Sequence, residues 1–156
     1  MANLVGPSGT RQVPVENICT GPRQTCIGED ELLVSIQLPK PENGFGANYL
    51  RFIPRNEMDI AVAGVGASVV ISDNKFKAAR VCLASVAPTP LYVEKSGTSL
   101  VGKSVSEEAV QEAANLAKDA AKPISDMRGT AEYRKHLCDV LTRRALNKAI
   151  ERAQGS

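Results

Sequence analysis

The sequence predicts an α+β fold, in which a small antiparallel sheet of three to four strands packs against about three C-terminal helices. In residues 31–94, short runs of apolar residues alternate with a period of two, which is typical of strands. After residue 104 the apolar residues recur with the helical period instead. Because the strand-like runs all precede the helical ones, the order differs from that of alternating βαβ units. With 4% aromatic residues and no tryptophan, the core must consist of aliphatic side chains and alanine.

The N-terminal part of the chain is rich in turn-forming residues. Within it, the run Glu31–Leu38 predicts a strand whose alternate apolar residues share one face, and Pro39 ends it. Residues 39–46 contain two prolines and two glycines and are the most linker-like stretch of the chain. We therefore predict a boundary there, with one domain at residues 1–46 and a second at residues 47–154.

The second domain begins with the residues that predict the main sheet. Residues 47–53 predict a first strand, which Pro54 ends. The valine-rich run 60–71 and the alternating run 76–86 flank a cluster of turn-forming residues, which predicts a long hairpin. A short further strand is expected at residues 91–94.

Two helices are predicted after the strands. Ser104–Glu107 resembles a capping box, and the helix that follows it runs to about Ala121 with a stripe of alanines on one face. Pro123 ends this helix. A longer helix begins after Gly129-Thr130 and runs to about Ala153.

Composition excludes several classes of protein. Nineteen basic and 17 acidic residues give a net charge of +2, too small to indicate a nucleic-acid partner. The longest apolar stretch, residues 60–71, is shorter than the ~20 residues that a membrane span requires. No basic segment followed by an apolar run opens the sequence, so we expect no signal peptide and a cytoplasmic location. The four cysteines and single histidine fit no metal-binding spacing, and we expect reduced, mostly buried thiols and no metal site.

Residues 97–104 match the phosphate-binding pattern G-x-x-x-x-G-K-[ST]. In a true phosphate loop this segment follows a strand of a parallel sheet, and an aspartate-bearing strand comes later in the chain. Here only helices follow residue 104, so we interpret the match as a glycine-containing loop before a capped helix. The G-x-G pairs at Gly44 and Gly64 lack a third glycine and a following helix, so they are not dinucleotide fingerprints.

Other reactive residues also have structural explanations. His136 and Cys138 are two positions apart on one predicted helix and therefore point to different faces, so we expect a surface histidine and a buried cysteine. The last helix carries an excess of basic residues, which we interpret as a solvated face.

The segment Pro123–Arg134 is denser in specific side chains than any other. Asp126 can form a turn, Thr130 can cap the next helix, and Arg128 is within reach of Asp126. We expect the ring of Tyr133 to face inward and its hydroxyl to bond to the loop. These features predict a rigid connection between two helices rather than a catalytic site.

The same segment, P-I-S-D-M-R-G-T-A-E-Y-R, resembles a hallmark of the C-terminal domain of the flavoprotein (medium) subunit of molybdenum hydroxylases, the family of carbon monoxide dehydrogenase and xanthine dehydrogenase. Further motifs of that family occur in the same order over roughly residues 5–153. They are Gly6–Pro14 (G-x-x-G-x-R-x-V-P), Thr20-Gly21, Glu29–Leu33, Tyr49-Leu-Arg51, Arg55, Asp59-Ile60-Ala61, Ala87–Pro90, Leu100–Lys103 and Leu141–Leu146.

The resemblance implies a role in an FAD-dependent oxidoreductase. In this family, electrons pass from the molybdenum cofactor through [2Fe-2S] clusters on partner subunits to FAD and then to an external acceptor. The C-terminal part of the flavoprotein covers one edge of the flavin, and by position Leu33, Arg51, Asp59 and Ile60 match residues near the cofactor. Arg51 stands where lysine is usual, and some relatives have an aromatic residue in place of Ile60. No residue here is expected to be catalytic, because hydroxylation occurs on the molybdenum subunit.

The resemblance also implies that partners complete the enzyme. They are the iron–sulfur subunit, the large molybdenum-binding subunit and the N-terminal FAD-binding half, which this sequence lacks, so we expect a natural split subunit or an excised domain. The alternative is a stand-alone docking or structural module that binds no flavin, and a third hypothesis is nucleotide binding by residues 97–104. Flavin colour in the purified protein distinguishes the flavoprotein subunit from the docking or structural module. The substrate and the electron acceptor are set on other chains.

Overall fold

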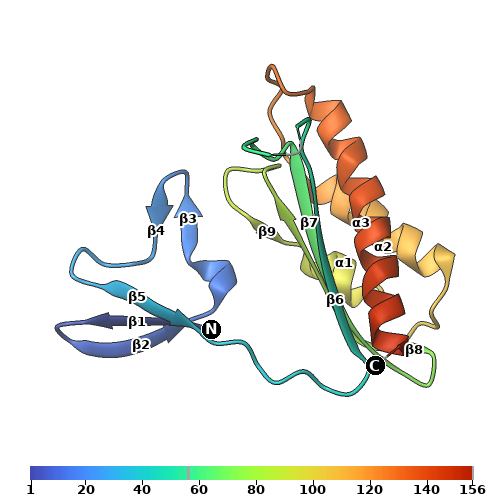
Figure 1. The fold of residues 1–156 in the computed structure, drawn as a ribbon, viewed down its shortest axis with the longest axis horizontal. Helices are drawn as coiled ribbons and strands as arrows, with labels where there is room; N and C mark the ends of the chain where they lie inside the picture. The colour runs from blue at the N-terminus through green and yellow to red at the C-terminus, as the bar shows by residue number, and fades with distance from the viewer. Residues whose placement is uncertain (56, 156) are drawn as a thin grey trace. The chain divides into compact units, whose positions relative to one another are not determined.

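The computed structural model of the protein describes residues 1–55 and 57–155. The chain forms two compact units, Met1–Pro41 and Glu42–Ser156. Figure 1 shows the strands of the first unit in blue and the second unit in green to red.

The first unit contains only short strands and one 3-10 turn, η1. A three-stranded antiparallel sheet has the order β2-β1-β5, and β3 pairs with β4 in a separate hairpin. Ala2, Leu4 and Val13 are its buried apolar residues, whereas every residue of β5 is exposed. The strands are β1 (Ala2–Gly6), β2 (Gly9–Val13), β3 (Cys19–Gly21), β4 (Gln24–Thr25) and β5 (Leu32–Ile36), and η1 spans Val15–Asn17.

An ion pair stabilises the loop before β5. Arg11 Nε and Nη2 donate to the two carboxylate oxygens of Glu31 at 2.6 and 2.7 Å, and Gly28 N–H donates to Glu31 Oε2 at 2.7 Å. The hydrogen bonds from Arg11, and next that from Gly28, lower the pKa of Glu31 to about 2.

The second unit is built on a four-stranded antiparallel sheet of order β6-β7-β8-β9. Asp73 and Asn74 connect β7 to β8 with φ angles of 51° and 56°, the left-handed backbone that a tight hairpin requires. The predicted hairpin is therefore confirmed, and the last predicted strand is shorter than expected. The strands are β6 (Phe45–Phe52), β7 (Ala63–Ser72), β8 (Lys75–Ala84) and β9 (Leu91–Tyr92).

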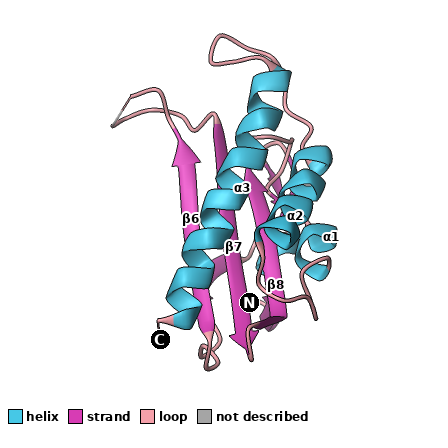
Figure 2. Ribbon diagram, turned by 90° about the vertical axis from the view of Figure 1, so that its right-hand side faces the viewer, coloured by secondary structure: helices cyan, strands magenta, loops and turns pink. Residues whose placement is uncertain are grey.

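Three helices cover one face of this sheet, which confirms the predicted α+β architecture. They are α1 (Glu94–Thr98), α2 (Glu107–Ala120) and α3 (Ala131–Gln154). Figure 2 shows α3 lying along β6 and β7, with α2 beside it and α1 over β8. The alanine stripe of α2 packs chiefly against α3 and α1 rather than on the strands. The core between sheet and helices is aliphatic and rich in alanine, as expected, and Phe76 is its largest fully buried side chain.

The close approach of α3 to β6 depends on a glycine. A Cβ on Gly46 would lie 1.9 Å from the carbonyl oxygen of Ala149 and 2.6 Å from the amide nitrogen of Ala153. The backbone of α3 therefore occupies the space that any side chain at position 46 would need.

None of the described helices of the second unit lies on the opposite side of the sheet, which is called here the open face. The strand register places on it the side chains that alternate with the core residues. The larger ones are Phe45, Tyr49, Arg51, Val70, Arg80, Cys82 and Tyr92.

The expectation that the cysteines are mostly buried is wrong. Only Cys138 of the four cysteines is buried; Cys19 and Cys82 are exposed and Cys26 is intermediate. The strand predicted at 31–38 is shorter, Leu32–Ile36, and its apolar residues remain exposed within the unit. Among the described helices, none is long and apolar enough to cross a membrane.

Candidate functional site

The four residues predicted to lie near a flavin belong to different units. Leu33 is an exposed residue on β5 of the first unit, opposite Leu4 of β1. Arg51 lies on β6 of the second unit, and Asp59 and Ile60 lie in the segment that follows this strand. Within the second unit, three of the predicted residues therefore lie on β6 or on the segment that connects β6 to β7.

Asp59 is a positioning residue. Its Oδ2 accepts a hydrogen bond from the backbone N–H of Arg55 at 3.1 Å, and its Oδ1 accepts one from the N–H of Ile60 at 2.9 Å. The Arg55 Nε lies 3.7 Å from the same carboxylate, whose side chain is only 9% exposed. Because both oxygens bond to the backbone, Asp59 fixes the loop instead of offering an unused carboxylate to a ligand.

Because Asp59 fixes the backbone of the loop, the side chain of Ile60 is held in an exposed position. Its side chain is 62% exposed, and Met58 beside it is also exposed, with a left-handed φ of 49°. An exposed isoleucine on a fixed backbone is suited to contact a planar apolar group. The contact would be available without a change in the loop.

Arg51 lies opposite a glycine on the sheet, and the Tyr49 side chain occupies the space above that glycine. Arg51 is exposed, and its partner across the strand pair is Gly64, which has no side chain. Two positions earlier on β6, the Tyr49 hydroxyl lies 2.7 Å from the point that a Cβ on Gly64 would occupy. Because Gly64 has no side chain, the Tyr49 side chain can lie across β7.

Sequence reasoning did not select Tyr49 as a site residue, although it belongs to the Tyr49-Leu-Arg51 motif. The signal was the spacing of two, since residues i and i+2 of a strand share a face. It also did not anticipate that the Arg80 guanidinium lies 4.4 Å from the ring centroid of Tyr92 on the same face.

These groups can bind, but they do not form a reaction centre. Among the described residues, no group of three or more His, Cys, Asp or Glu side chains could hold a metal ion. His136 is exposed on α3, whereas Cys138 is buried, and burial raises the pKa of the Cys138 thiol to about 11. The expectation that these two residues face different surroundings is confirmed.

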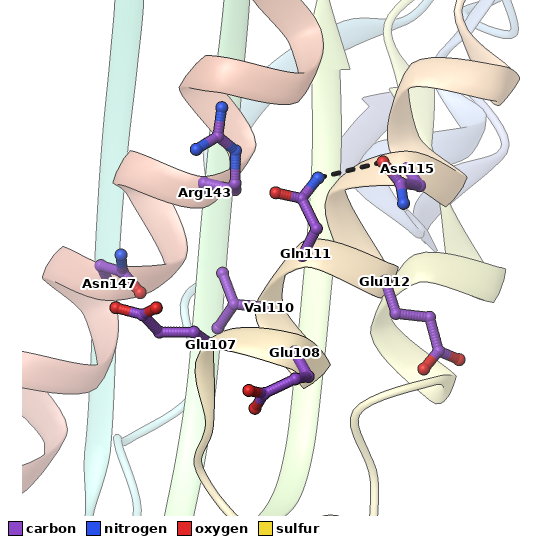
Figure 3. A pocket seen from close by; sticks show the side chains of 8 residues that line it. All are labelled: Glu107, Glu108, Val110, Gln111, Glu112, Asn115, Arg143 and Asn147. Atoms are coloured by element: carbon purple, nitrogen blue, oxygen red, sulfur yellow. Dashed lines mark hydrogen bonds between the residues drawn. The ribbon is translucent and has the colours of Figure 1, made fainter.

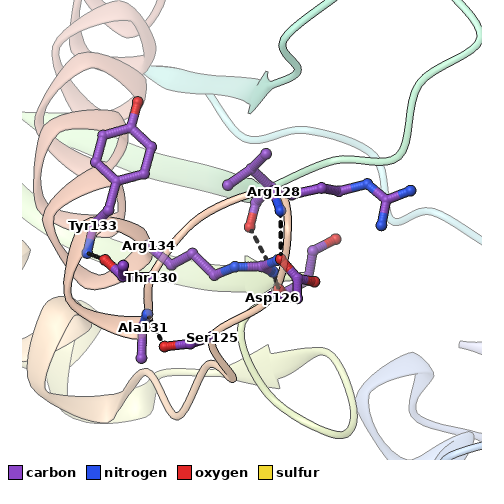
Figure 4. A network of polar contacts seen from close by, with 9 residues as sticks. Ser125, Asp126, Arg128, Thr130, Ala131, Tyr133 and Arg134 are labelled. Carbon is purple, nitrogen blue, oxygen red and sulfur yellow. Dashed lines mark hydrogen bonds and ion pairs between the residues drawn. The ribbon is translucent and has the colours of Figure 1, made fainter.

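The loop before α3 is structural (Figure 4). Asp126 accepts hydrogen bonds from the backbone N–H of Arg128 at 2.9 Å and from Nη2 of Arg134, and these two, in the order Arg134 then Arg128, lower the pKa of its carboxyl. Thr130 caps α3 by accepting from the N–H of Tyr133, as predicted. The expected inward orientation of Tyr133 is wrong, because its ring meets Phe52 edge-on and remains 41% exposed.

The segment that matches the phosphate-loop pattern has no amides directed at a ligand. The N–H of Gly102 donates to Phe76 O at 2.8 Å, and that of Lys103 donates to Leu100 O at 3.0 Å. Lys103 Nζ pairs with Glu112 at 2.5 Å. Since carbonyls and a carboxylate already satisfy these donors, the structure contradicts nucleotide binding here.

A groove of about 620 Å³ runs between α2 and α3 (Figure 3). Its polar groups bond to one another, since Gln111 Nε2 donates to both Asn115 and Asp139, and Arg143 Nε donates to Asp139 at 3.2 Å. This groove is therefore a polar seam between two packed helices. Its lining residues are Glu107, Glu108, Val110, Gln111, Glu112, Asn115, Arg143 and Asn147.

Comparison with known families decides the relationship of the chain. The profile of the CO dehydrogenase flavoprotein C-terminal domain matches residues 48–149. The chain belongs to this family. The matched range contains Tyr49, Arg51, Asp59 and Ile60, whereas Leu33 precedes it.

Individual relatives agree with membership of the CO dehydrogenase flavoprotein C-terminal domain family. The chain is 37% identical over 151 residues to the carbon monoxide dehydrogenase medium chain of Afipia carboxidovorans, covering 97% of this chain and 52% of the relative. It is 29% identical to the xanthine dehydrogenase FAD-binding subunit of Escherichia coli O157:H7, covering 96% and 51%. A solved carbon monoxide dehydrogenase from Hydrogenophaga pseudoflava, which lacks the Mo-pyranopterin moiety of its molybdenum cofactor, superimposes with a TM-score of 0.92 at 34% identity, covering 97% and 52%. The chain thus spans about half the length of these relatives.

Proposed function

We propose that the chain is the C-terminal portion of the flavoprotein subunit of a molybdenum hydroxylase and that it helps to bind FAD. Membership of the flavoprotein C-terminal domain family supports the proposal, as does the likeness to a subunit named for FAD binding. The observation that carries it is the exposed Ile60, fixed by Asp59 next to the end of the strand that bears Arg51.

The residues present fit an isoalloxazine ring and its polar substituents. Ile60 is an exposed apolar side chain of the second unit that can cover a planar ring and exclude water from it, and Leu33 is an exposed apolar side chain of the first unit. Arg51 supplies a permanent cation with donors for a carbonyl or phosphate oxygen. Asp59 orients Ile60 through the backbone. When bound, FAD would supply the electron-accepting chemistry, and the residues of this chain would bind and orient it.

For the first unit, we propose that residues 1–46 are the end of an FAD-binding domain and residues 47–154 the flavoprotein C-terminal domain. The support lies in β5, where Leu32, Val34 and Ile36 are exposed on an edge strand. An apolar edge strand is a pairing surface that folded proteins cover. The relatives are about twice as long as this chain, so they have additional chain that can provide the cover.

The proposed partners are an iron–sulfur subunit and a large molybdenum-binding subunit, in a cytoplasmic enzyme. The term "medium chain" in the names of relatives implies other subunits in those enzymes, and one solved relative is described by its molybdenum cofactor. Through these partners, electrons from substrate would reach the flavin by way of [2Fe-2S] clusters.

The test is the flavin content of the complete assembly, isolated from the native host through a tag on this chain. Ile60→Asp places a charge where the ring should lie, and we expect FAD to dissociate at least about tenfold more readily. The control is Val101→Asp, an exposed apolar residue near the turn between β7 and β8, at the opposite end of the sheet. Equal flavin retention in both variants would refute the role of Ile60.

The alternative, a docking module that binds no flavin, has a separate outcome. We expect the isolated chain to be colourless, because the loops that hold the FAD pyrophosphate in this family lie outside it. An assembly that purifies intact, active in electron transfer, but without flavin near this chain would favour the docking module.

A further inference from the structure

Three connecting segments of the second unit meet at one end of its sheet. In the strand register, the last residue of β6 faces the first residue of β7, and the last residue of β8 faces the second residue of β7. The segment 57–62, which leads into β7, and the loop 85–90, which follows β8, therefore adjoin the same edge. The loop 121–130 before α3 reaches this edge too, because the N–H of Lys122 donates to Val86 O at 2.8 Å.

Arg134, in the first turn of α3, connects these three segments through one guanidinium. Its Nη1 donates to Val62 O at 3.4 Å and to Ser85 O at 3.3 Å, and its Nη2 pairs with Asp126 of the loop 121–130 (Figure 4). The side chain is 6% exposed, so water competes little for these contacts. Ser85 has a left-handed φ of 65°, a backbone that a residue with a side chain rarely adopts, and the bond from Arg134 holds its carbonyl in that arrangement.

The loop 121–130 gives Arg134 a fixed point of attachment. Asp126 and Gly129 donate their backbone N–H groups to each other's carbonyl oxygens, both at 3.1 Å. A Cβ on Gly129 would lie 3.9 Å from Val62 Cγ1, so this turn lies next to the entry to β7. The loop itself therefore holds the Asp126 carboxylate in the place where the guanidinium meets it.

We propose that Arg134 is a positioning residue for Ile60. The proposal rests on the proposed function, in which Ile60 contacts the flavin. The backbone of Ile60 has a fixed point on each side. On one side, Asp59 Oδ1 accepts the hydrogen bond from the Ile60 N–H at 2.9 Å. On the other side, the Val62 N–H donates to Phe52 O at 2.9 Å, and the Val62 carbonyl oxygen accepts from Arg134. Without Arg134, this second point depends on one backbone hydrogen bond, and the side chain of Ile60 is free to shift relative to the ring.

The same contacts couple Ile60 to a surface that faces solvent. In the loop 121–130, the side chain of Met127 is 95% exposed. Because Asp126 joins this loop to Arg134, a contact that steadies the loop should also steady Ile60. Binding of FAD should in turn steady the loop, since coupling between two sites is reciprocal.

The test uses the complete assembly, isolated from the native host through a tag on this chain. Amide hydrogen exchange reports on the segment directly, because the N–H groups of Ile60 and Val62 are both hydrogen-bonded. Arg134→Met should speed the exchange of these two amides at least about fivefold, in the FAD-free assembly as well as in the loaded one, and should speed FAD release at least about threefold. Arg134→Lys, which keeps the charge but has fewer donors, should recover part of both effects.

A second variant and a control separate positioning from a general loss of stability. Asp126→Asn weakens the ion pair but leaves Arg134 in place, and it should move both measurements in the same direction. The control is Phe76→Leu, which destabilises the core at the opposite end of the sheet, where β8 begins. It should lower the Tm without a selective effect on the amides of Ile60 and Val62.

Two results would overturn the positioning role. One is equal acceleration of exchange in the Phe76 and Arg134 variants. The other is FAD release at the parent rate in both Arg134→Met and Asp126→Asn, while Ile60→Asp releases FAD faster. The proposed function fails separately: if Ile60→Asp retains FAD as the parent does, the flavin contact of Ile60 is refuted, whereas selectively faster exchange in Arg134→Met would still show that Arg134 fixes the segment.

Discussion

Replacing Arg134 should destabilise the second unit strongly. The guanidinium is 6% exposed and connects three parts of the chain: Nη1 donates to Val62 O at 3.4 Å and to Ser85 O at 3.3 Å, and Nη2 pairs with Asp126. Arg134→Met keeps the length of the side chain and removes all three contacts. The buried Val62 carbonyl and the partly buried Ser85 carbonyl then lose their donor, while the carboxylate can still reach water because its side chain is 30% exposed.

The expected loss in the free energy of unfolding follows from the lengths and burial of these hydrogen bonds. Hydrogen bonds to a charged group contribute about 1.5–3 kcal/mol each, but the two to carbonyls are long, and removal of a buried cation recovers part of its desolvation cost. We therefore expect a net loss of about 2–3 kcal/mol in the free energy of unfolding. For a unit of this size, about 4 °C per kcal/mol gives a Tm lower by about 8–12 °C.

The assay is thermal unfolding followed by far-UV circular dichroism at the helix band, because the described α-helices all lie in the second unit. The control, Arg144→Met, removes an exposed arginine from the same helix and should change the Tm by less than about 2 °C. Arg134→Lys should lie between the two, since an ammonium cannot reach all three acceptors. If Arg134→Met melts within about 2 °C of the parent, the reasoning about this buried contact is wrong.

Three further predictions concern other parts of the chain. Gly46→Ala should lower the Tm by about 10 °C, because the added Cβ would meet Ala149 O at 1.9 Å and force α3 from the sheet; an unchanged Tm would contradict this close contact. Glu31 should titrate near pH 2 by carboxyl NMR, so its contribution to stability is complete above about pH 4.5 and is lost as the pH falls toward 2; Arg11→Met should return the midpoint toward the ordinary value. Lys103→Ala should have no effect on Mg-ATP in calorimetry, since no binding is expected, and micromolar binding that the variant loses would restore the nucleotide hypothesis.

The order of the elements could be predicted because the period of apolar residues changes once along the chain. The hairpin of β7 and β8 and the capping of α3 by Thr130 follow from local chemistry. The side-chain partner of Asp126 could not be predicted from local chemistry. Local spacing favoured Arg128, but only the backbone N–H of Arg128 bonds to Asp126. The side chain that reaches Asp126 comes from Arg134, eight positions away. Such a contact depends on how the loop closes onto the sheet.

At the candidate site, too, some features could be predicted from the sequence and others could not. Motif order selected Arg51, Asp59 and Ile60, but the sequence could not reveal that Asp59 bonds to backbone amides and that Ile60 is the group on display. Nor could alternation in β5 show whether its apolar face is covered. A period of two predicts that the two faces of a strand differ in polarity. Whether the apolar face is buried depends on residues in other parts of the protein.

The contact between α3 and β6 has a consequence for synthesis on the ribosome. β6 is the first strand of its sheet to be made, yet α3, the last helix, supplies the backbone that packs on Gly46 and the arginine that bonds to Ala47 O. Until residue 154 has left the exit tunnel, the apolar side of β6 and β7 has no permanent cover. Translation therefore passes through a stage in which a nearly complete sheet is exposed to chaperones and to other nascent chains, and a pause in the codons for α3 would lengthen that stage.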